Sequence, residues 1–258
     1  MSNSAQILVS NDDGVQAPGL LALKQALESL GEVTVIAPER GWSAAGHTKT
    51  MHKPLRIWQV ELADGSAAYT SSGTPSDCVA LAVMEAIPVQ PDLVVSGINS
   101  GANMGHDITY SGTVAAAMEG VIAELPAMAV SLDTSDEAAD YGYAAHVAAL
   151  LARQLLERGL PRQVLLNVNV PDLPPEEIKG IRITRLGQRV YRDVLVVRSD
   201  PRGRPYYWVG GDRPLGVAED GTDVGALAEG YVSVTPLFMD MTAHHLLDEM
   251  RGWNLTLE

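Results

Sequence analysis

Several features common in proteins are absent from this sequence, and each absence narrows what the protein can be. Its 258 residues include one cysteine, Cys78, and no apolar run of membrane-spanning length. A single cysteine cannot form a disulfide within the chain, which excludes a disulfide-stabilised scaffold. The first residues also lack the charged, apolar and small-residue order of a secretion signal. We therefore expect a soluble, cytoplasmic protein with no membrane contact.

Basic residues are scarce. The chain has 18 lysine and arginine residues against 32 aspartate and glutamate residues, a formal net charge of −14. Affinity for polyphosphate depends mainly on neutralising phosphates with lysine and arginine, so stable nucleic-acid binding is not expected. A small anionic substrate is still compatible with this charge if a metal ion or backbone amides receive it.

A dinucleotide-binding motif is also absent, although the chain begins with the pattern of a Rossmann-like fold. An apolar run at residues 7–9 is followed by leucines at helical spacing over residues 19–30 and by a second strand-forming run at residues 33–37. A strand, helix, strand unit this short crosses over to a parallel neighbour. The glycines G-x-G-x-x-G, which a dinucleotide site needs in the first turn, are missing, and this argues against a coenzyme-dependent dehydrogenase.

With 46% hydrophobic residues and no linker or repeat, the sequence predicts one α/β domain over residues 1–258, a Rossmann-like, mostly parallel sheet flanked by helices. We expect a core over about residues 1–178, an extended β-hairpin arm over about 179–213, and a C-terminal strand and helix within 214–258. Further strands are expected at 66–72, 91–96, 126–132 and 164–170, and a long helix over 137–158. Another helix should begin at Thr74, with Cys78 as a small core residue inside it.

The first strand stops at four residues with turn-forming character, Asn11, Asp12, Asp13 and Gly14. In an open α/β sheet, ligands bind outside the carboxyl ends of the strands, so these side chains would stand at the binding edge. Adjacent carboxylates repel unless a cation, a hydrogen-bond cluster or solvent offsets their charge. One interpretation is a divalent metal site. The other is a capped turn, since asparagine, aspartate and glycine favour turns for backbone reasons alone.

Two later loops are expected at the same edge of the sheet. The loop after the second strand contains Ser43 and His47, and the loop after the strand at residues 91–96 contains Asn99, Ser100 and Asn103. Glycines spaced through the second loop allow backbone amides to approach a ligand closely. Taken alone, Ser43 is more simply explained as a solvated serine and His47 as a packed histidine. For the second loop, an ordinary flexible connection explains the residues as well as a binding role does.

An alanine-rich helix follows Ser111, Gly112 and Thr113. Its amino end would direct free N–H groups and the positive end of the helix dipole toward the same site, as an anionic substrate requires. The alternative interpretation is an ordinary helix cap.

Four motifs in one order make the combined pattern specific. They are ILVSNDDG at residues 7–14, SAAGH at 43–47, SGTPSDC at 72–78, and SGINSGANMG at 96–105, which continues to YSGT at 110–113. Together they closely resemble the survival protein E (SurE) family of nucleotidases, and the resemblance extends from Ile7 to about Pro236. It implies a metal-dependent phosphomonoesterase acting on nucleoside 5′- and 3′-monophosphates, with a homodimer or homotetramer as the working unit. One departure stands at residues 41–42, Gly-Trp, where family members often carry charged residues, and it bears on substrate preference.

The same resemblance assigns four metal ligands, Asp12, Asp13, Ser43 and Asn99. Two carboxylates, a hydroxyl and an amide carbonyl are hard oxygen ligands, which favour one Mg²⁺ or Mn²⁺ per subunit over Zn²⁺. One of the two aspartates is also expected to take the proton of the attacking water, and the sequence does not distinguish them. Our hypothesis for the phosphate contacts is Asn11, Gly46, Asn103, Ser111 and Thr113.

Positive charge is concentrated in the expected arm. Residues 179–213 hold nine of the 18 basic residues with three aspartates and no glutamate, so the arm carries about +6 and the rest of the chain about −20. Strand-like stretches at 194–198 and 206–209 flank a turn within it. A solvated hairpin without a partner is one interpretation. In the SurE family, however, this region is a hairpin exchanged between subunits, and we expect the arm to mediate assembly here.

Two other functions compete with a metal-dependent nucleotidase. A covalent aspartyl-phosphatase also places an aspartate after its first strand, but its pattern needs two acids separated by one residue, whereas these are adjacent. A non-catalytic nucleotide-binding module would need the same anion site without an activated water. A phosphoenzyme trapped during turnover would favour the first alternative, and nucleotide binding without phosphate release the second.

Overall fold

The computed structural model describes residues 4–190, 193–211, 215–253 and 255–256. Its helices are α1 (Pro18–Leu27), α2 (Pro75–Val83), α3 (Gly112–Ile122), α4 (Gly142–Arg158), α5 (Asp223–Ala228) and α6 (Leu247–Arg251), with 3-10 turns η1 (Gly105–Thr109), η2 (Pro175–Glu177) and η3 (His244–Leu246). Its strands are β1 (Ala5–Ser10), β2 (Gly31–Pro38), β3 (Ile57–Glu61), β4 (Ala67–Ser71), β5 (Leu93–Ser100), β6 (Ala127–Asp133), β7 (Val164–Pro171), β8 (Ile181–Ile183), β9 (Gln188–Val190), β10 (Asp193–Ser199), β11 (Pro205–Gly211), β12 (Leu215–Val217) and β13 (Val232–Phe238).

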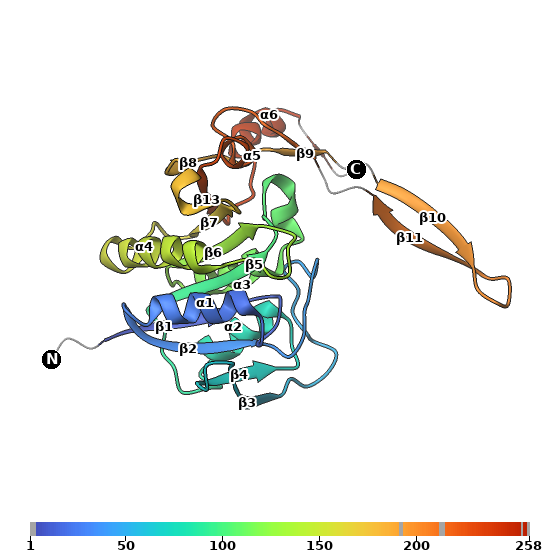
Figure 1. Ribbon diagram of the computed structural model, residues 1–258. Coiled ribbons are helices and arrows are strands. Elements are labelled where there is room, and N and C mark those ends of the chain that lie inside the picture. The colour runs from blue at the N-terminus through green and yellow to red at the C-terminus, as the bar shows by residue number, and fades with distance from the viewer. Residues whose placement is uncertain (1–3, 191–192, 212–214, 254, 257–258) are drawn as a thin grey trace.

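The main sheet is mostly parallel, as the sequence predicts. Within the described ranges it has nine strands in the order β3-β4-β2-β1-β5-β6-β7-β13-β8 (Figure 1). Neighbours from β4 through β7 run parallel, whereas β3 and β13 are antiparallel to β4 and β7. The strands β2, β1 and β5 are therefore adjacent, and their carboxyl ends meet at one edge.

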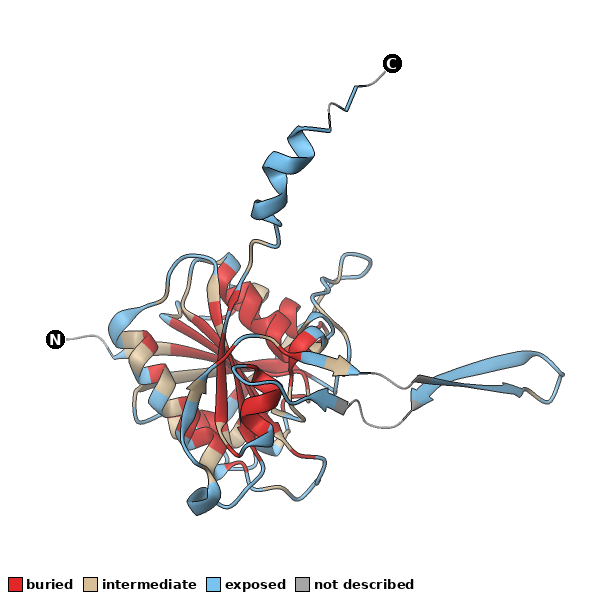
Figure 2. Ribbon diagram, turned by 90° about the horizontal axis from the view of Figure 1, so that it is seen from above, coloured by how far each residue is buried: buried red, intermediate tan, exposed pale blue. Residues whose placement is uncertain are grey.

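Helices cover both faces of this sheet. Ile7 and Val9 of β1 belong to the cluster that contains the buried residues of α1 and α4, whereas Leu8 packs with α2 and α3. All three side chains are fully buried. Successive side chains of a strand point to opposite faces, so an unbroken apolar run is what a central strand between two helical layers requires. Figure 2 shows the resulting core, in red, along the middle strands.

The expected start of α2 at Thr74 is confirmed. The Thr74 hydroxyl oxygen accepts a hydrogen bond from the backbone N–H of Asp77 at 3.1 Å, and the Asp77 carboxylate accepts the N–H of Thr74 at 2.9 Å. This reciprocal pair satisfies two donors that a helix start otherwise leaves without partners. Cys78 is fully buried one turn later, as expected of a small core residue.

Two element boundaries differ from the sequence expectation. The long helix α4 begins at Gly142 rather than at residue 137, because the Asp140 carboxylate accepts the N–H of Gly142 at 2.8 Å and holds the preceding residues in a turn. Strand β5 continues to Ser100, so Asn99 lies at the end of a strand rather than in a loop. The register with β6 shifts between Ser96 and Asn99, which allows the strand to continue past Gly97.

The expected hairpin is present and projects from the body of the molecule (Figure 1). Strands β10 and β11 pair antiparallel from Asp193 with Gly211 to Ser199 with Pro205. Its apolar and aromatic side chains are exposed, including Val194, Leu195 and Trp208. The arm is shorter than the expected 179–213, because β8 belongs to the main sheet through β13. Residues 191–192 and 212–214 of that range lie outside the described residues.

The C-terminal segment also stands away from the body. Figure 2 shows α6 extended from it and exposed along its length. His244, in η3 before α6, is exposed, and its Nε2 lies 2.6 Å from an Asp240 carboxylate oxygen. Across the described residues, no helix combines the length and apolar character needed to cross a membrane.

Candidate active site

A pocket of about 350 Å³ lies where β1, β2 and β5 end. Adjacent parallel strands release their loops at one edge, so segments far apart in the sequence meet there. The lining residues are Asp12, Asp13, Ser43, Ala44, Asn99, Ser100, Ala102, Asn103, Asp107, Tyr110 and Ser111. The expectation that these three loops share one site is confirmed.

The turn after β1 is closed by its own asparagine. The Asn11 side chain donates to the carbonyl of Gly14 at 3.0 Å and accepts the Gly14 N–H at 3.2 Å. Gly14 has a φ of 103°, a conformation that favours glycine. Because Asn11 is fully buried and both ends of its amide serve the turn, it supports the two aspartates from behind rather than lining the pocket.

Asp12 is packed against the amino end of α3. Its carboxylate accepts the hydroxyl of Thr113 at 2.5 Å, and a Cβ at Gly112 would lie only 2.7 Å from the Cβ of Asp12. Burial raises the pKa of Asp12 to about 6; hydrogen bonds from Thr113 oppose this rise and the charge of Asp13 adds to it. A negative charge here is therefore costly unless a cation offsets it.

Asp13 faces the end of β5. One of its carboxylate oxygens accepts the backbone N–H of Ser100 at 3.1 Å. Burial raises the pKa of Asp13, and the Ser100 hydrogen bond only partly opposes this. The two adjacent acids are thus held by different elements, Asp12 by α3 and Asp13 by β5.

Ser43 reaches the pocket on the loop that follows β2. The N–H of Trp42 donates to the Asp12 carbonyl at 2.8 Å, and the N–H of Gly46 donates to the Tyr110 carbonyl at 2.8 Å. These two bonds hold the loop on either side of Ser43. Gly46 is needed for this conformation, because its φ is 58° and a Cβ there would lie 3.1 Å from the Thr109 carbonyl oxygen.

The two asparagines after the middle of β5 are held differently. The Asn99 Nδ2 donates to the Gly101 carbonyl at 2.7 Å, which leaves Oδ1 as the amide atom available to a cation. Asn103 is anchored by its backbone: its N–H donates to the Asn169 side chain at 2.8 Å, and its carbonyl accepts from Asn167 and Asn169. Its own Nδ2 donates to Ser131.

The residues proposed from sequence as metal ligands meet in this pocket. Asp12, Asp13, Ser43 and Asn99 all line it and present carboxylate, hydroxyl and amide oxygens. These donors include neither a thiolate nor an imidazole, the ligands that zinc sites use most. In the described part of the chain, no group of three or more histidine, cysteine, aspartate or glutamate side chains is arranged to hold a metal ion. The buried Asp12 and the partly buried Asp13, both with raised pKa values and beside neutral oxygen donors, fit a hard divalent cation such as Mg²⁺ or Mn²⁺.

Comparison with known proteins identifies the family. Residues 7–193 match the family described as survival protein SurE. The chain belongs to the SurE family. A 5′-nucleotidase SurE from Chloroflexus aggregans is 54% identical over 96% of this chain and 98% of that protein. A 5′-nucleotidase SurE from Herpetosiphon aurantiacus is 56% identical over 92% of this chain and 93% of its own length.

A solved SurE structure has the same fold. The crystal structure of the SurE protein from Aquifex aeolicus is 41% identical, covers 97% of this chain and 100% of its own, and superposes with a TM-score of 0.81. The Rossmann-like fold expected from sequence is therefore shared with a family member over nearly the full length.

Not every expected phosphate contact lines the pocket of this SurE chain. Asn103 and Ser111 do, whereas Asn11, Gly46 and Thr113 direct their polar groups at Gly14, Tyr110 and Asp12. Among the polar lining residues, the sequence analysis did not name Asp107 and Tyr110 as candidates. The signal for Tyr110 was its place directly before Ser111. Asp107 lies in η1 and carried no comparable signal.

A buried carboxylate joins the pocket wall to the root of the SurE hairpin. Asp223, which is fully buried, accepts the N–H of Gly105 at 2.8 Å and the N–H of Gly187 at 2.7 Å. Gly105 begins η1 in the pocket wall, and Gly187 immediately precedes β9. In addition, Arg189 of β9 lies 3.0 Å from the carboxylate of Asp107.

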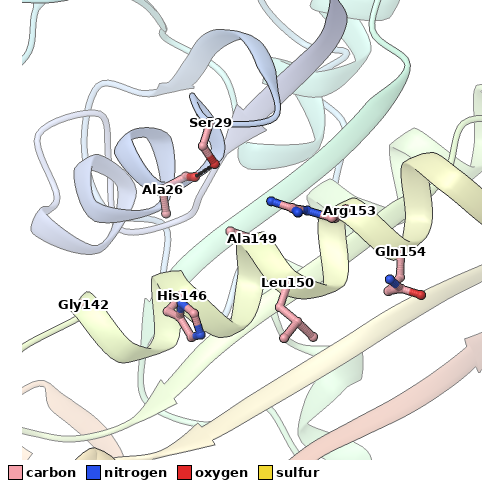
Figure 3. A pocket seen from close by; sticks show the side chains of 8 residues that line it. All are labelled: Ala26, Ser29, Gly142, His146, Ala149, Leu150, Arg153 and Gln154. Atoms are coloured by element: carbon pink, nitrogen blue, oxygen red, sulfur yellow. Dashed lines mark hydrogen bonds between the residues drawn. The ribbon is translucent and has the colours of Figure 1, made fainter.

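A second hollow of the SurE chain is less suited to catalysis. A groove of about 600 Å³ lies between α1 and α4 (Figure 3). His146, Leu150 and Arg153 project from α4, and the hydroxyl of Ser29 is engaged by the carbonyl of Ala26. None of the residues that line this groove is an acid, so it lacks the donor set of the pocket at the strand ends.

Proposed function

We propose that this protein is a metal-dependent phosphomonoesterase that hydrolyses nucleoside 5′- and 3′-monophosphates to nucleoside and phosphate. The observation that carries the proposal is the pair of adjacent aspartates, the buried Asp12 and the partly buried Asp13, which share one pocket with the Ser43 hydroxyl and the Asn99 amide. The curated relatives named 5′-nucleotidase SurE support the nucleotide as the substrate class.

One Mg²⁺ or Mn²⁺ per subunit is the cofactor we propose, held by Asp12, Asp13, Ser43 and Asn99. Such an ion supplies a positive charge for the phosphate oxygens and lowers the pKa of a nearby water. The protein's own contribution is to hold the donors in place, with Thr113 on Asp12 and the Ser100 N–H on Asp13. One of the two aspartates also accepts the proton of the attacking water.

The phosphate is proposed to lie against Ser111 and Asn103, at the amino end of α3. Ser111 caps that helix by accepting the Val114 N–H at 3.1 Å, and its hydroxyl proton stays available to a ligand. The positive end of the helix dipole favours an anion at this position. Asn11, Gly46 and Thr113 act here by supporting Asp12 and the Ser43 loop rather than by touching phosphate.

The working assembly is proposed to be a homodimer or homotetramer formed through the hairpin β10–β11. Trp208 in this hairpin is 66% exposed, and Val209 beside it is 76% exposed. An isolated two-stranded ribbon is marginally stable in water, so these side chains need a covering surface. Residues 179–213 as a whole carry about +6, which the acidic body of a second copy complements; the hairpin at 193–211 contributes three arginines and two aspartates to this charge.

Phosphate release from a panel of nucleoside monophosphates tests the proposal. Turnover should need added Mg²⁺ or Mn²⁺ and stop in EDTA. Turnover that persists in EDTA, together with a trapped phosphoenzyme, would point instead to a covalent aspartyl-phosphatase. Nucleotide binding without phosphate release under any of Mg²⁺, Mn²⁺ or Ca²⁺ would identify a binding module.

A further inference from the structure

Glu119 is a buried acid whose two partners both lie on the loop that carries Ser43. It is 2% exposed and projects from α3. One of its carboxylate oxygens lies 2.6 Å from Nε2 of His47, and the other lies 3.0 Å from Nζ of Lys49. His47 and Lys49 are exposed residues four and six positions after Ser43. The buried Glu119 thus holds two exposed residues of this loop, His47 and Lys49.

The charge on Glu119 is stabilised by these partners. Burial alone would raise its pKa, but the hydrogen bonds from His47 and Lys49 and their positive charge outweigh burial and lower the pKa. Glu119 is therefore ionised at neutral pH. A buried carboxylate draws its partners strongly, because the charge has few other ways to be compensated.

The same helix also holds Asp12. Thr113, in the first turn of α3, donates to the Asp12 carboxylate, and Glu119 follows six residues later, a rise of about 9 Å along the helix. One rigid element therefore holds Asp12 at its amino end and the Ser43 loop further along. The separation between these two parts of the pocket is set by the geometry of α3.

Other contacts hold the loop by its backbone. Thr48 accepts the hydroxyl of Thr74 at 2.7 Å, and the N–H of Thr50 donates to Asp77 at 3.0 Å, so the end of the loop is attached to the start of α2. Between Trp42 and Thr48, the described hydrogen bonds from the loop to other segments are those of the Gly46 N–H to Tyr110 and of the His47 side chain to Glu119. Glu119 thus adds a side-chain contact to the loop directly after the Gly46 backbone bond, on the carboxyl side of Ser43.

We propose that Glu119 is a positioning residue for the cation. Through His47 and Lys49 it fixes the loop so that the Ser43 hydroxyl stays beside Asp12 and Asp13. This inference rests on the proposed function, since it takes Ser43 to be a metal ligand. Partners behind a ligand typically change metal affinity by about 10- to 100-fold when removed, and an effect in this range is expected here.

The test is Mn²⁺ affinity, measured by calorimetry on the purified full-length protein without substrate. The variants are Glu119→Gln, which keeps the shape of the side chain, and His47→Ala, which removes only an exposed partner. Asp12→Asn reports whether the measured ion occupies the proposed site. Asp64→Asn is the matched control, because Asp64 binds Lys24 at 2.9 Å in a partly buried pair that contacts none of the pocket residues.

The expected result is that Glu119→Gln and His47→Ala each weaken Mn²⁺ binding at least tenfold, whereas Asp64→Asn leaves it unchanged. Combining the two substitutions should add little to either alone, because they break one contact. Saturating Mn²⁺ should restore most of kcat, which a globally loosened fold would not allow. Wild-type affinity in both single variants would overturn the positioning role. Absence of Mn²⁺ binding in the wild-type protein would overturn the proposed metal site as well.

Discussion

Asp12→Asn should remove activity and at the same time stabilise the metal-free protein. Asp12 is 6% exposed, and the pKa of its carboxyl group, about 6, lies well above the ordinary value of 3.8. This difference corresponds to about 3 kcal/mol by which the folded protein disfavours the ionised form. Asparagine removes the charge, and its carbonyl can still accept the Thr113 hydroxyl. We therefore expect the variant to gain up to about 3 kcal/mol at pH 8 in EDTA, or roughly 6–12 °C in Tm for a chain of this size.

The raised pKa of Asp12 also predicts how the free energy of unfolding changes with pH. Because the pKa of Asp12 is higher in the folded state, the folded protein keeps a proton that the unfolded chain has released between pH 3.8 and about 6. The contribution of Asp12 to the stability of the wild-type protein in EDTA should fall through this window and then stay low. The Asp12→Asn variant should lack that part of the slope, so the gap between the two proteins opens with rising pH.

Urea unfolding at fixed protein concentration, at pH 4, 5, 6, 7 and 8, measures this gap. Adding Mn²⁺ at 1,000 times its Kd should reverse the order, since the ion then stabilises the wild-type protein by about 4.1 kcal/mol and the variant by much less. An Asp12→Asn protein that is less stable than the wild type in EDTA at pH 8 would refute the reasoning about burial. A folded variant with near wild-type turnover would refute the metal assignment.

Three further substitutions test other parts of the structure. Cys78→Ala should keep activity, because burial raises the pKa of the thiol and keeps it unreactive; loss of turnover in a folded Ala variant would contradict this. Gly112→Ala should weaken Mn²⁺ binding at least tenfold, because a Cβ at Gly112 would lie 2.7 Å from the Cβ of Asp12 and displace that side chain. The helix content measured by circular dichroism should not change. Unchanged Mn²⁺ affinity would show that the turn adjusts freely. Replacing residues 202–207 with a Gly/Ser turn should shift light scattering toward smaller species and lower activity, and a wild-type protein that is monomeric and fully active at micromolar concentration would exclude a role for the hairpin in assembly.

The sequence predicted those parts of the fold that depend on local pattern. The apolar run of β1, the capping pair at Thr74 and the turn of the hairpin each have a short-range physical cause, and all three are present. The meeting of the loops also followed from sequence, because parallel neighbours release their loops at one edge. The continuation of β5 to Ser100 did not, since it depends on pairing with β6, which is distant in the chain.

The sequence predicted the proposed metal ligands, but not the residues that hold those ligands in place. Asp12, Asp13, Ser43 and Asn99 stand in recognisable motifs, and they line one pocket. The structure adds which polar groups are already engaged, and a motif does not carry that information. Thr113 is the clearest example, because its hydroxyl would suit a phosphate but is directed at Asp12. Glu119 stands within the alanine-rich helix, and only the fold brings it to the Ser43 loop.

Asp223 links the pocket wall mechanically to the root of the hairpin. Its carboxylate accepts hydrogen bonds from the N–H of Gly105 in the pocket wall and from the N–H of Gly187 at the root of the hairpin. Because one buried carboxylate accepts both N–H groups, a displacement of either segment strains the hydrogen bond to the other. The proposed assembly surface and the proposed substrate site are therefore coupled through one buried carboxylate, so a change of contacts at the hairpin is expected to alter the pocket wall as well.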